Sequence, residues 1–439
     1  MDQLNCSLSF LVEFYSCSFR AEVFRMFRLM LGGWIVCLGR RTISRVWEST
    51  GRSQYQDHSA AFRLFSEAVW NWDEVCRILI LQIFATLIPG FDVWLVVDDT
   101  LCHKRGGCVA FGGMFLDAVL STKKKKIFRY GNNWVTLGLV VQLPFRADRY
   151  YCLNVLWRVA EKQGDKPRAQ HRSKPQLAAE MIGKIAGWLP GATLRVVADV
   201  AYIGRYLLKD RPQNVELIGP IRSDAALTEP CPANSGRRKK GERLASPREI
   251  LNGDDSRWPT EAIRFIHLKG EKELAIKVVR NVCWYDVAGS APLMLVLIRD
   301  PKGVWRDEYL LSTDTSLSVQ EILAGYCRRW SVEVAYADTK GMLGFHEPEV
   351  WCSNSVQRAH PMAWFVGSLV VLWYALHGEC HKTPQRHRPW YKHKPEVTFA
   401  DMLATCRYQL WETWLKNSAS DAELDERRAW LMEFLATAA

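Results

Sequence analysis

Two short apolar runs, each followed at once by an aspartate, constrain the fold of this chain most strongly. Residues 91–97 follow a Pro-Gly turn and are followed by Asp98; residues 193–198 also follow a Pro-Gly pair and are followed by Asp199. Apolar, β-branched runs of this length after turn residues predict buried strands. If the two strands are neighbours in one sheet, the two carboxylates converge at its edge. A single aspartate at a strand end also serves ordinary turns.

The periodicity of the chain changes several times and predicts an α/β protein with five regions. Residues 1–88 have a helical pattern and form a candidate DNA-binding region, and residues 89–210 combine strands with a helix. Residues 211–312 contain short strand-like runs and form a β-rich insertion. The helical pattern returns over residues 313–380. A basic connector then leads to a last helical region, residues 381–439.

Smaller segments complete this outline. Residues 134–143 predict a further strand, and residues 182–189 the end of a helix. The longest uncharged run, residues 361–376, is shorter than a membrane-spanning helix, so we expect a core helix there. Three arginines within residues 39–47 fit either a turn of a DNA-binding module or a surface turn.

Composition narrows the partners of the protein. The 439 residues include 58 Lys and Arg against 47 Asp and Glu, a net charge of +11, which favours a polyanionic partner. Three basic segments, residues 123–126, 237–240 and 386–394, fit either a DNA backbone or a solvated surface. The 13 cysteines contain no Cys-x-x-Cys pair, and the first residues lack the pattern of an export signal. We therefore expect a cytoplasmic location.

The most specific motif lies on a predicted helix. Ser318 and Glu321 match a capping box that begins the helix, and Gly341 is a suitable residue to end it. At about 100° per residue, four side chains fall within an arc of about 60°: Tyr326, Arg329, Glu333 and Lys340. A structural stripe of that width is normally apolar, whereas this one combines an aromatic ring, two cations and an acid.

The spacing of these four residues resembles the Y-x2-R-x3-E-x6-K signature of a group of bacterial insertion-sequence transposases, which are DDE enzymes. Residues 97–100 and 196–202 are similar to the segments that carry the first two acids in this group, and the resemblance covers about residues 90–380. It implies an RNase H-like mixed sheet flanked by helices and interrupted by a β-rich insertion domain. It also implies Asp98, Asp199 and Glu333 as the catalytic acids.

The chemistry of phosphodiester cleavage agrees with this set of acids. Two divalent ions about 3.5–4 Å apart can stabilise both the attacking and the leaving oxygen. Carboxylate oxygens suit Mg²⁺, with Mn²⁺ as the expected substitute. Asp98, Asp199 and Glu333 are therefore the expected ligands of two magnesium ions. Asp99 stays open as an alternative first ligand, because neighbouring strand residues point to opposite faces.

The other residues of the motif are expected to bind DNA. Arg329 and Lys340 would contact phosphates of the transposon end, the arginine through its two-pronged guanidinium. Tyr326 would contact a phosphate or pack near a displaced base. In some relatives an aromatic residue before a Leu-Leu-Thr-like strand stacks on a flipped base; Tyr309 occupies that place here, with Trp305 as the alternative.

The expected function is that of a DNA transposase that cuts at the terminal inverted repeats of its own element and joins the freed 3′-hydroxyl ends to target DNA. The resemblance implies a homodimer on two double-stranded ends, in a bacterial cytoplasm near the nucleoid. The alternative is an inactive descendant that only binds DNA. A two-carboxylate glycoside hydrolase fits less well, because it needs neither Arg329 and Lys340 nor the positive charge. The sequence leaves open the repeat sequence, the target and whether excision uses a hairpin.

Overall fold

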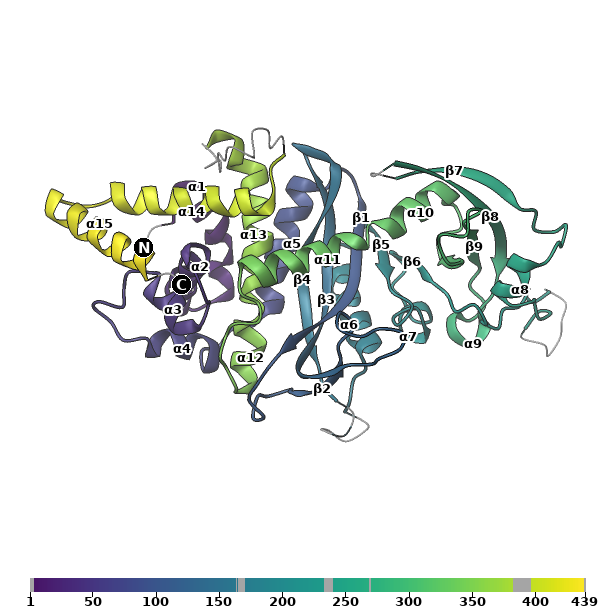
Figure 1. The fold of residues 1–439 in the computed structure, drawn as a ribbon, viewed down its shortest axis with the longest axis horizontal. Helices are drawn as coiled ribbons and strands as arrows, with labels where there is room; N and C mark the ends of the chain where they lie inside the picture. The colour runs from purple at the N-terminus through teal and green to yellow at the C-terminus, as the bar shows by residue number, and fades with distance from the viewer. Residues whose placement is uncertain are drawn as a thin grey trace.

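The structure is a computed structural model that describes residues 4–162, 164, 170–232, 240–267, 270–381 and 396–437. Its N-terminal region is helical and packs against helices from the C-terminal part of the chain (Figure 1). These N-terminal helices are α1 (Cys6–Glu13), η1 (Phe14–Ser18), α2 (Ala21–Val36), α3 (Ile43–Glu48), α4 (Ser59–Ser66) and α5 (Trp72–Leu87). Asn5 and Asn71 begin α1 and α5, because each side-chain oxygen accepts a backbone N–H of the first turn.

The three arginines near the start of α3 all contact other parts of the chain. Arg41 is buried, and its guanidinium donates to two carbonyl oxygens at the end of α2. Arg40 forms an ion pair with Glu349, and Arg45 forms one with Glu48. Arg41 is thus part of the packing, and a DNA-binding role for the N-terminal region stays a prediction.

Within the described residues, ten strands form one mixed sheet (Figure 1). The strands are β1 (Asp92–His103), β2 (Gly113–Leu116), β3 (Phe128–Leu143), β4 (Arg146–Ala160), β5 (Thr193–Ala198), β6 (Val215–Pro220), β7 (Glu261–His267), β8 (Gly270–Val282), β9 (Leu293–Arg299) and β10 (Glu308–Ser312). Their order is β2-β3-β1-β5-β6-β10-β9-β8-β7, and β4 also pairs with β3.

The predicted RNase H-like mixed sheet flanked by helices is confirmed. Strands β4, β3 and β1 are antiparallel neighbours, and β5 and β6 follow parallel to β1. Helices α11 (Trp330–Met342) and α13 (Met362–His377) cover one face of the sheet. The other face carries α6 (Lys174–Trp188), which Ser173 and Gln176 cap, and the short α7 (Arg205–Leu208).

The β-rich stretch predicted over residues 211–312 contains β6 and extends the same sheet. Strand β10 pairs with β6 on one side and with β9 on the other, and β8 and β7 follow as an antiparallel continuation. The short helices α8 (Pro247–Asn252) and α9 (Tyr285–Ala288) connect these strands. An unpaired edge on β6 would expose its backbone groups, and β10 satisfies them.

The predicted capping box at Ser318 is confirmed, but the helix that it begins has two parts, α10 (Val319–Cys327) and α11. Between them the backbone N–H groups of Arg328 and Arg329 bond to carbonyl oxygens three residues back rather than four. This is the tighter geometry of a 3₁₀ turn. Arg329 is therefore the N-cap of α11, which begins at Trp330.

The remaining helices are α12 (Ser353–Ala359), α13, η2 (Gly378–Cys380), α14 (Phe399–Lys416) and α15 (Asp421–Ala436). Of the described residues, 353–380 are the one helical stretch long and apolar enough to cross a membrane, yet 89% of its apolar window is buried inside the protein. In α13 every residue from Met362 to Tyr374 is buried. The prediction of a core helix is therefore confirmed.

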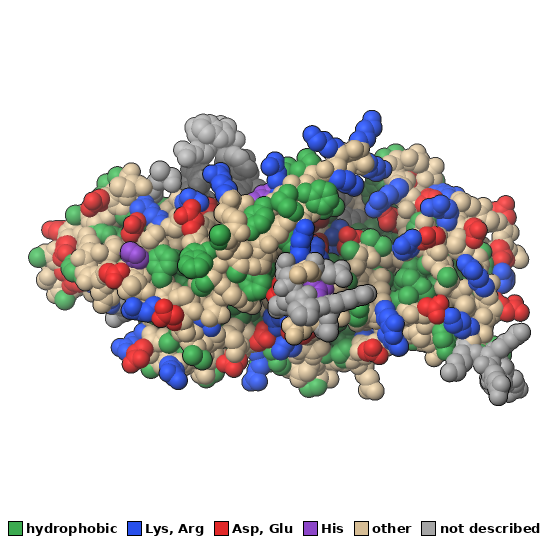
Figure 2. Space-filling model, turned by 90° about the horizontal axis from the view of Figure 1, so that it is seen from below, with side chains coloured by type: hydrophobic (Ala, Val, Ile, Leu, Met, Phe, Trp, Pro, Cys, Tyr) green, Lys and Arg blue, Asp and Glu red, His purple; other side chains and the backbone are tan. Residues whose placement is uncertain are grey.

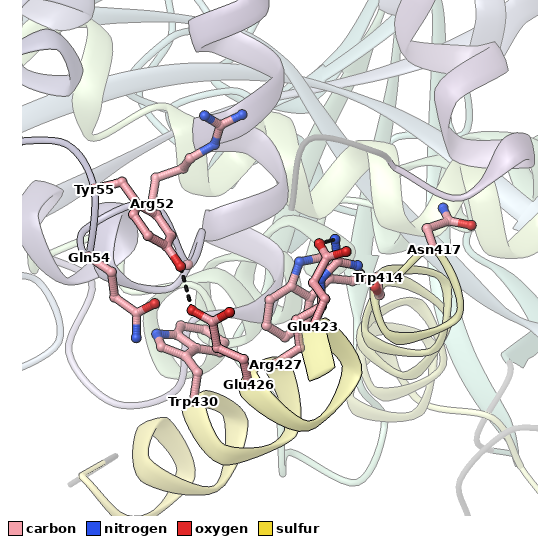
Figure 3. Close-up of a pocket in the computed structure, with 10 residues that line it drawn as sticks. Arg52, Gln54, Tyr55, Trp414, Asn417, Glu423, Glu426, Arg427 and Trp430 are labelled. Carbon is pink, nitrogen blue, oxygen red and sulfur yellow. Dashed lines mark hydrogen bonds and ion pairs between the residues drawn. The ribbon is translucent and has the colours of Figure 1, made fainter. Parts of the chain in front are cut away.

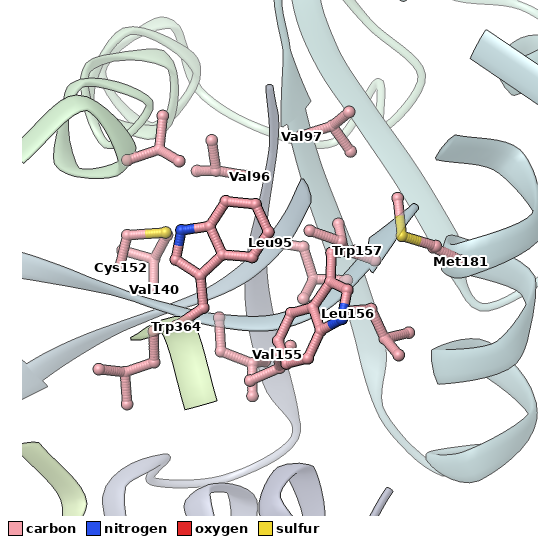
Figure 4. Packing of buried hydrophobic residues seen from close by; sticks show 14 of the residues in the cluster. Leu95, Val96, Val97, Val140, Cys152, Val155, Leu156, Trp157, Met181 and Trp364 are labelled. Carbon is pink, nitrogen blue, oxygen red and sulfur yellow. The ribbon is translucent and has the colours of Figure 1, made fainter. Parts of the chain in front are cut away.

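The core beneath α13 combines aromatic and aliphatic side chains, with Trp157 and Trp364 among Leu and Val residues in Figure 4. The ring of Trp364 stacks on Phe345 with centroids 4.2 Å apart and lies 5.7 Å from both Trp134 and Trp157, which come from β3 and β4. On the other face of the sheet, Met181 of α6 is fully buried. The central strands are thus covered on both faces, which fixes the position of β1.

We expect Trp364→Ala to lower the free energy of unfolding by about 3–5 kcal/mol, because it removes a buried indole from four aromatic contacts. Urea unfolding followed by circular dichroism measures this loss. Trp351 is 71% exposed and provides the control. The variant Trp351→Ala should unfold like the wild type, and equal losses for the two variants would contradict this description of the core.

Candidate active site

Asp98 and Asp199 lie beside each other on neighbouring parallel strands. Val97 pairs with Ala198 in the ladder of β1 and β5, so the next residues, Asp98 and Asp199, lie at the same level. Neighbouring strands lie about 4.8 Å apart. The two carboxylates therefore start from adjacent backbone positions at the point where β5 ends.

The expectation that β1 ends before Asp98 is wrong. The strand continues to His103, because its antiparallel partner β3 is longer than β5 and pairs with it as far as Gly131. Asp98 is consequently held in regular strand backbone, and the direction of its side chain is fixed. Asp199, by contrast, directly follows the last residue of β5.

The face of β1 that carries Asp98 is the face covered by α11. Alternate strand residues share a face, and Thr100 accepts a hydrogen bond of 2.6 Å from Lys340 Nζ near the end of α11. On β3, Thr136 lies opposite Asp98 and is 2.5 Å from the hydroxyl of Tyr336, also on α11. These two polar contacts fix the helix of the motif against the strand of the first acid.

Asp99 points to the opposite face and is bound by side chains of the fold. Lys174 Nζ, at the start of α6, lies 2.6 Å from one carboxylate oxygen, and the Tyr202 hydroxyl donates to the other at 2.8 Å. Both oxygens of Asp99 are therefore engaged in structural contacts. Of the two adjacent acids, the geometry favours Asp98 as the first acid of the site.

Arg329 lies among the three predicted acids. Its guanidinium is 3.0 Å from the carboxylate of Asp98 and 4.0 Å from that of Glu333. It also interacts electrostatically with Asp199. Burial tends to lower the pKa of this guanidinium, but the surrounding carboxylates raise it overall. Acids from β1, from the end of β5 and from α11 thus share one cation.

The charge state of Asp98 reflects its position. Burial raises the pKa of this carboxyl to about 6, although Arg329 and the backbone N–H of Asp99 act in the opposite direction. The side chain of Asp98 is only 16% exposed, whereas that of Glu333 is 46% exposed. A poorly solvated carboxylate favours a cation beside it. This part of the sheet edge therefore attracts positive charge.

Tyr326, at the end of α10, belongs to the same group. It is partly buried, which raises the pKa of its hydroxyl, and it interacts with both Arg329 and Asp199. The structure thus brings together most of the predicted residues: Asp98, Asp199, Tyr326, Arg329 and Glu333 around one point, with Lys340 further along α11.

Tyr309 stays outside this group. On β10 the neighbouring Glu308 interacts with Tyr326, whereas Tyr309 interacts with Arg299. Because neighbouring strand residues point to opposite faces, Tyr309 faces away from the acids. The alternative residue, Trp305, is 53% exposed, and Lys272 lies over its ring.

Sequence reasoning did not single out Arg306. This arginine precedes β10, forms an ion pair of 2.8 Å with Glu308, and interacts electrostatically with Asp199 and Tyr326. It adds a solvent-facing cation beside the second acid. No spacing rule in the sequence links it to the motif, because its position depends on the pairing of β10 with β6.

The three acids supply suitable ligand atoms for magnesium, but their present arrangement does not form a metal site. Three carboxylates supply the oxygen ligands that Mg²⁺ prefers. As arranged, however, no group of three Asp, Glu, His or Cys among the described residues could hold a metal ion. Arg329 occupies the space between Asp98 and Glu333. A shared ion requires this guanidinium to move to another anion.

The basic segments differ in how far the structure describes them. Residues 386–394 and 237–239 lie outside the described residues. Lys240 forms an ion pair of 2.6 Å with Asp286. Residues 123–126 are described, and all four are exposed.

A cavity of about 350 Å³ lies elsewhere, between residues 51–55 and the helices α14 and α15 (Figure 3). Its charged groups are paired with their neighbours: Arg427 lies 2.5 Å from Glu423, and the Tyr55 hydroxyl donates to Glu426 at 2.6 Å. None of the predicted site residues lines it. The cavity therefore belongs to the packing of the C-terminal helices on the N-terminal region.

Acids on two adjacent strands of an RNase H-like sheet, with a third on the covering helix, define the class of DDE nucleases. The chain belongs to the family described as DDE superfamily endonuclease, whose sequence profile matches residues 13–287. The matched region contains Asp98 and Asp199 and ends before Glu333.

Comparison with solved structures gives a more distant likeness. The chain is similar to a structure described as the cryo-EM structure of piggyBac transposase synaptic complex with hairpin DNA, with a TM-score of 0.42 and 13% sequence identity, covering 95% of this chain and 80% of that chain. This likeness is too distant to assign a role to any residue. No curated protein matches the chain in sequence.

We expect Asp99→Asn to destabilise the fold by about 1–3 kcal/mol, because it weakens partly buried contacts to Lys174 and Tyr202. Urea unfolding should show that Asp99→Asn and Tyr202→Phe are non-additive, with a coupling of about 0.5–3 kcal/mol. Loss of DNA cleavage by Asp99→Asn at unchanged stability would instead make Asp99 the first acid.

Proposed function

We propose that this protein is a DNA transposase that cuts at the terminal inverted repeats of its own mobile element and joins the freed 3′-hydroxyl ends to target DNA. The observation that carries the proposal is the meeting of Asp98, Asp199 and Glu333 around Arg329 in a member of the DDE superfamily endonucleases. Endonuclease chemistry follows from the family, and the joining step from the resemblance of the motif.

The three acids are the proposed ligands of two Mg²⁺ ions, which Mn²⁺ would replace. When bound, such ions supply charge stabilisation for the attacking and leaving oxygens of a phosphodiester. Asp98 and Asp199 approach from the sheet, and Glu333 approaches from α11. The contacts of Lys340 with Thr100 and of Tyr336 with Thr136 hold this helix in place against the sheet.

Arg329 and Lys340 are the proposed phosphate-binding residues. Arg329 already lies beside an anion, so a DNA phosphate offers it an exchange of partner rather than a new buried charge. Its departure from Asp98 frees that carboxylate at the moment DNA arrives. Tyr326, next to Arg329, is placed to contact the same phosphate or the adjoining base.

The partner is double-stranded DNA, both the element ends and the target, and the net charge of +11 favours such a polyanion. Pairing of two ends by a homodimer and a location in the bacterial cytoplasm near the nucleoid complete the proposal.

We expect Asp98→Asn, Asp199→Asn and Glu333→Gln each to slow DNA cleavage by about 10³-fold or more, equivalent to about 4 kcal/mol in activation free energy. The substrate is a supercoiled plasmid that carries the DNA flanking the reading frame, and nicking in Mg²⁺ or Mn²⁺ is followed on gels. Asp338 on α11 faces Arg149 instead of the other acids, so Asp338→Asn is the matched control. If one of the three variants cleaves DNA as fast as the wild type, that residue does not belong to the site. If the wild-type protein binds DNA but does not nick it, the protein is an inactive descendant.

The ion pair of Arg329 with Asp98 predicts a second effect. In EDTA, Asp98→Asn should bind duplex DNA about 3–10-fold more tightly than the wild type, because the guanidinium is released from its internal partner. Fluorescence anisotropy measures the affinity. Asp338→Asn removes one negative charge from α11 and should raise the affinity for DNA by less. An equal gain in an Arg329→Gln background would show that Arg329 is not the phosphate ligand.

A further inference from the structure

The hairpin of β2 and β3 extends beyond the end of β1. Strand β2 pairs with residues 128–131 of β3, whereas β1 ends at His103 opposite Gly131. We call residues 113–131 the basic hairpin. It projects from the lower end of the sheet in Figure 1, and Figure 2 views the molecule from that side, where Lys and Arg side chains lie in several groups.

The turn of the basic hairpin has a defined shape. One oxygen of Asp117 accepts the backbone N–H groups of Val119 and Leu120 at 3.0 Å each, and the other lies 2.6 Å from His103 Nε2. The hydroxyl of Ser121 accepts a further backbone N–H of the turn at 2.9 Å. These bonds hold the tip of the hairpin in one conformation.

The charges of the basic hairpin are almost all positive. Its cations are four lysines and one arginine, all exposed: Lys123, Lys124, Lys125, Lys126 and Arg129. None of them forms an ion pair with a described residue. Asp117 is the single acid in residues 113–131, and its oxygens are engaged in the turn. The positive charge of the hairpin is therefore available to an external anion.

Apolar side chains accompany these cations. Met114 pairs with Tyr130 and Leu116 pairs with Phe128, so these four side chains share one face of the hairpin. Met114, Leu116 and Phe128 are between 43% and 56% exposed, and Val119 in the turn is 89% exposed. Exposed apolar groups next to a dense positive charge are typical of proteins that insert side chains into a DNA groove.

The basic hairpin continues a line of cations that begins at the acids. Along β1, Asp98 meets Arg329, Thr100 meets Lys340, and His103 marks the base of the hairpin. At about 3.4 Å per strand residue, His103 is about 17 Å from Asp98, and the tip of the hairpin is on the order of 30 Å away. This span corresponds to about nine base pairs of duplex DNA.

We propose that the basic hairpin binds the duplex about nine base pairs from the phosphodiester that the acids cleave. The four lysines contact backbone phosphates, and Leu116 and Phe128 lie against the minor groove. This inference rests on the proposed function, because the acids define the starting point of the duplex.

The positive charge of the basic hairpin favours DNA over other partners for this surface. A second copy of the chain would bring the same positive hairpin, and like charges at one contact are repulsive. An anionic lipid surface shares the charge requirement but not the alignment with Arg329 and Lys340. Binding to lipid vesicles is therefore an outcome that the experiment must distinguish.

The first test measures how DNA affinity depends on salt. The variant has Lys123→Gln, Lys124→Gln, Lys125→Gln and Lys126→Gln together, and the control has Lys209→Gln, Lys302→Gln, Lys416→Gln and Arg428→Gln, which removes four exposed cations elsewhere. With a 30-base-pair duplex of the flanking DNA, the slope of log K against log salt should fall by about 3.6 in the hairpin variant, because each of the four lost phosphate contacts removes about 0.9. An unchanged slope, or a fall equal to that of the control, would overturn the inference.

The second test locates the contact. A photo-crosslinking residue at position 124 should mark the duplex about nine base pairs from the cleavage site, and Leu116→Ser with Phe128→Ser should weaken this crosslink. Crosslinking to a second copy of the chain, or loss of binding to phosphatidylserine vesicles without loss of DNA affinity, would overturn the inference. Crosslinking to DNA in a protein that never nicks DNA would reject the proposed cleavage and keep the hairpin contact. Normal nicking with no crosslink would reject the hairpin contact and keep the proposed cleavage.

Discussion

The parallel pairing of β1 with β5 is the contact on which the candidate site depends. The pair Val97 and Ala198 places the next residues, Asp98 on β1 and Asp199 after β5, at the same level. A shift of β1 by one residue would turn Asp98 toward α6 and bring Asp99 under α11. Polar contacts resist this shift, because Lys340 bonds to Thr100 on one face while Lys174 and Tyr202 bond to Asp99 on the other. These contacts determine which of the two adjacent acids faces α11.

Arg329 makes this group of acids compatible with a folded protein. Carboxylates gathered at a poorly solvated sheet edge repel one another, and an unpaired buried charge is costly. The guanidinium is held where α10 gives way to α11, and its charge offsets that repulsion. The same arrangement makes the site sensitive to other ions. An anion that binds Arg329 releases the acids, and a cation that binds the acids releases Arg329. In the proposed function, this single side chain would link the binding of DNA to the binding of metal.

The sequence predicted the local elements better than their pairing. The run at residues 193–198 became β5 and Ser318 capped α10, because strand propensity and capping depend on neighbouring residues. Strand β4 was missed, since it begins with polar residues and follows β3 through a short connection. The Asp-x-Thr spacing favoured Asp98 but left Asp99 open, because the choice between them depends on the face that α11 covers. Tyr309 was placed by resemblance, and the pairing of β10 turns it away from the acids.

The length of β3 connects the acids to the basic hairpin. This strand of 16 residues pairs with β4, with β1 and, at its start, with β2. At Gly131 it lies opposite both His103 and Gly113, and a Cβ there would collide with the carbonyl oxygen of Cys102. Glycine is therefore required where the three strands meet. Because one continuous strand spans this distance, the separation between Asp98 and the lysines is set by strand rise rather than by a linker. A duplex bound to both would be held in a fixed register, which positions one particular phosphodiester at the acids.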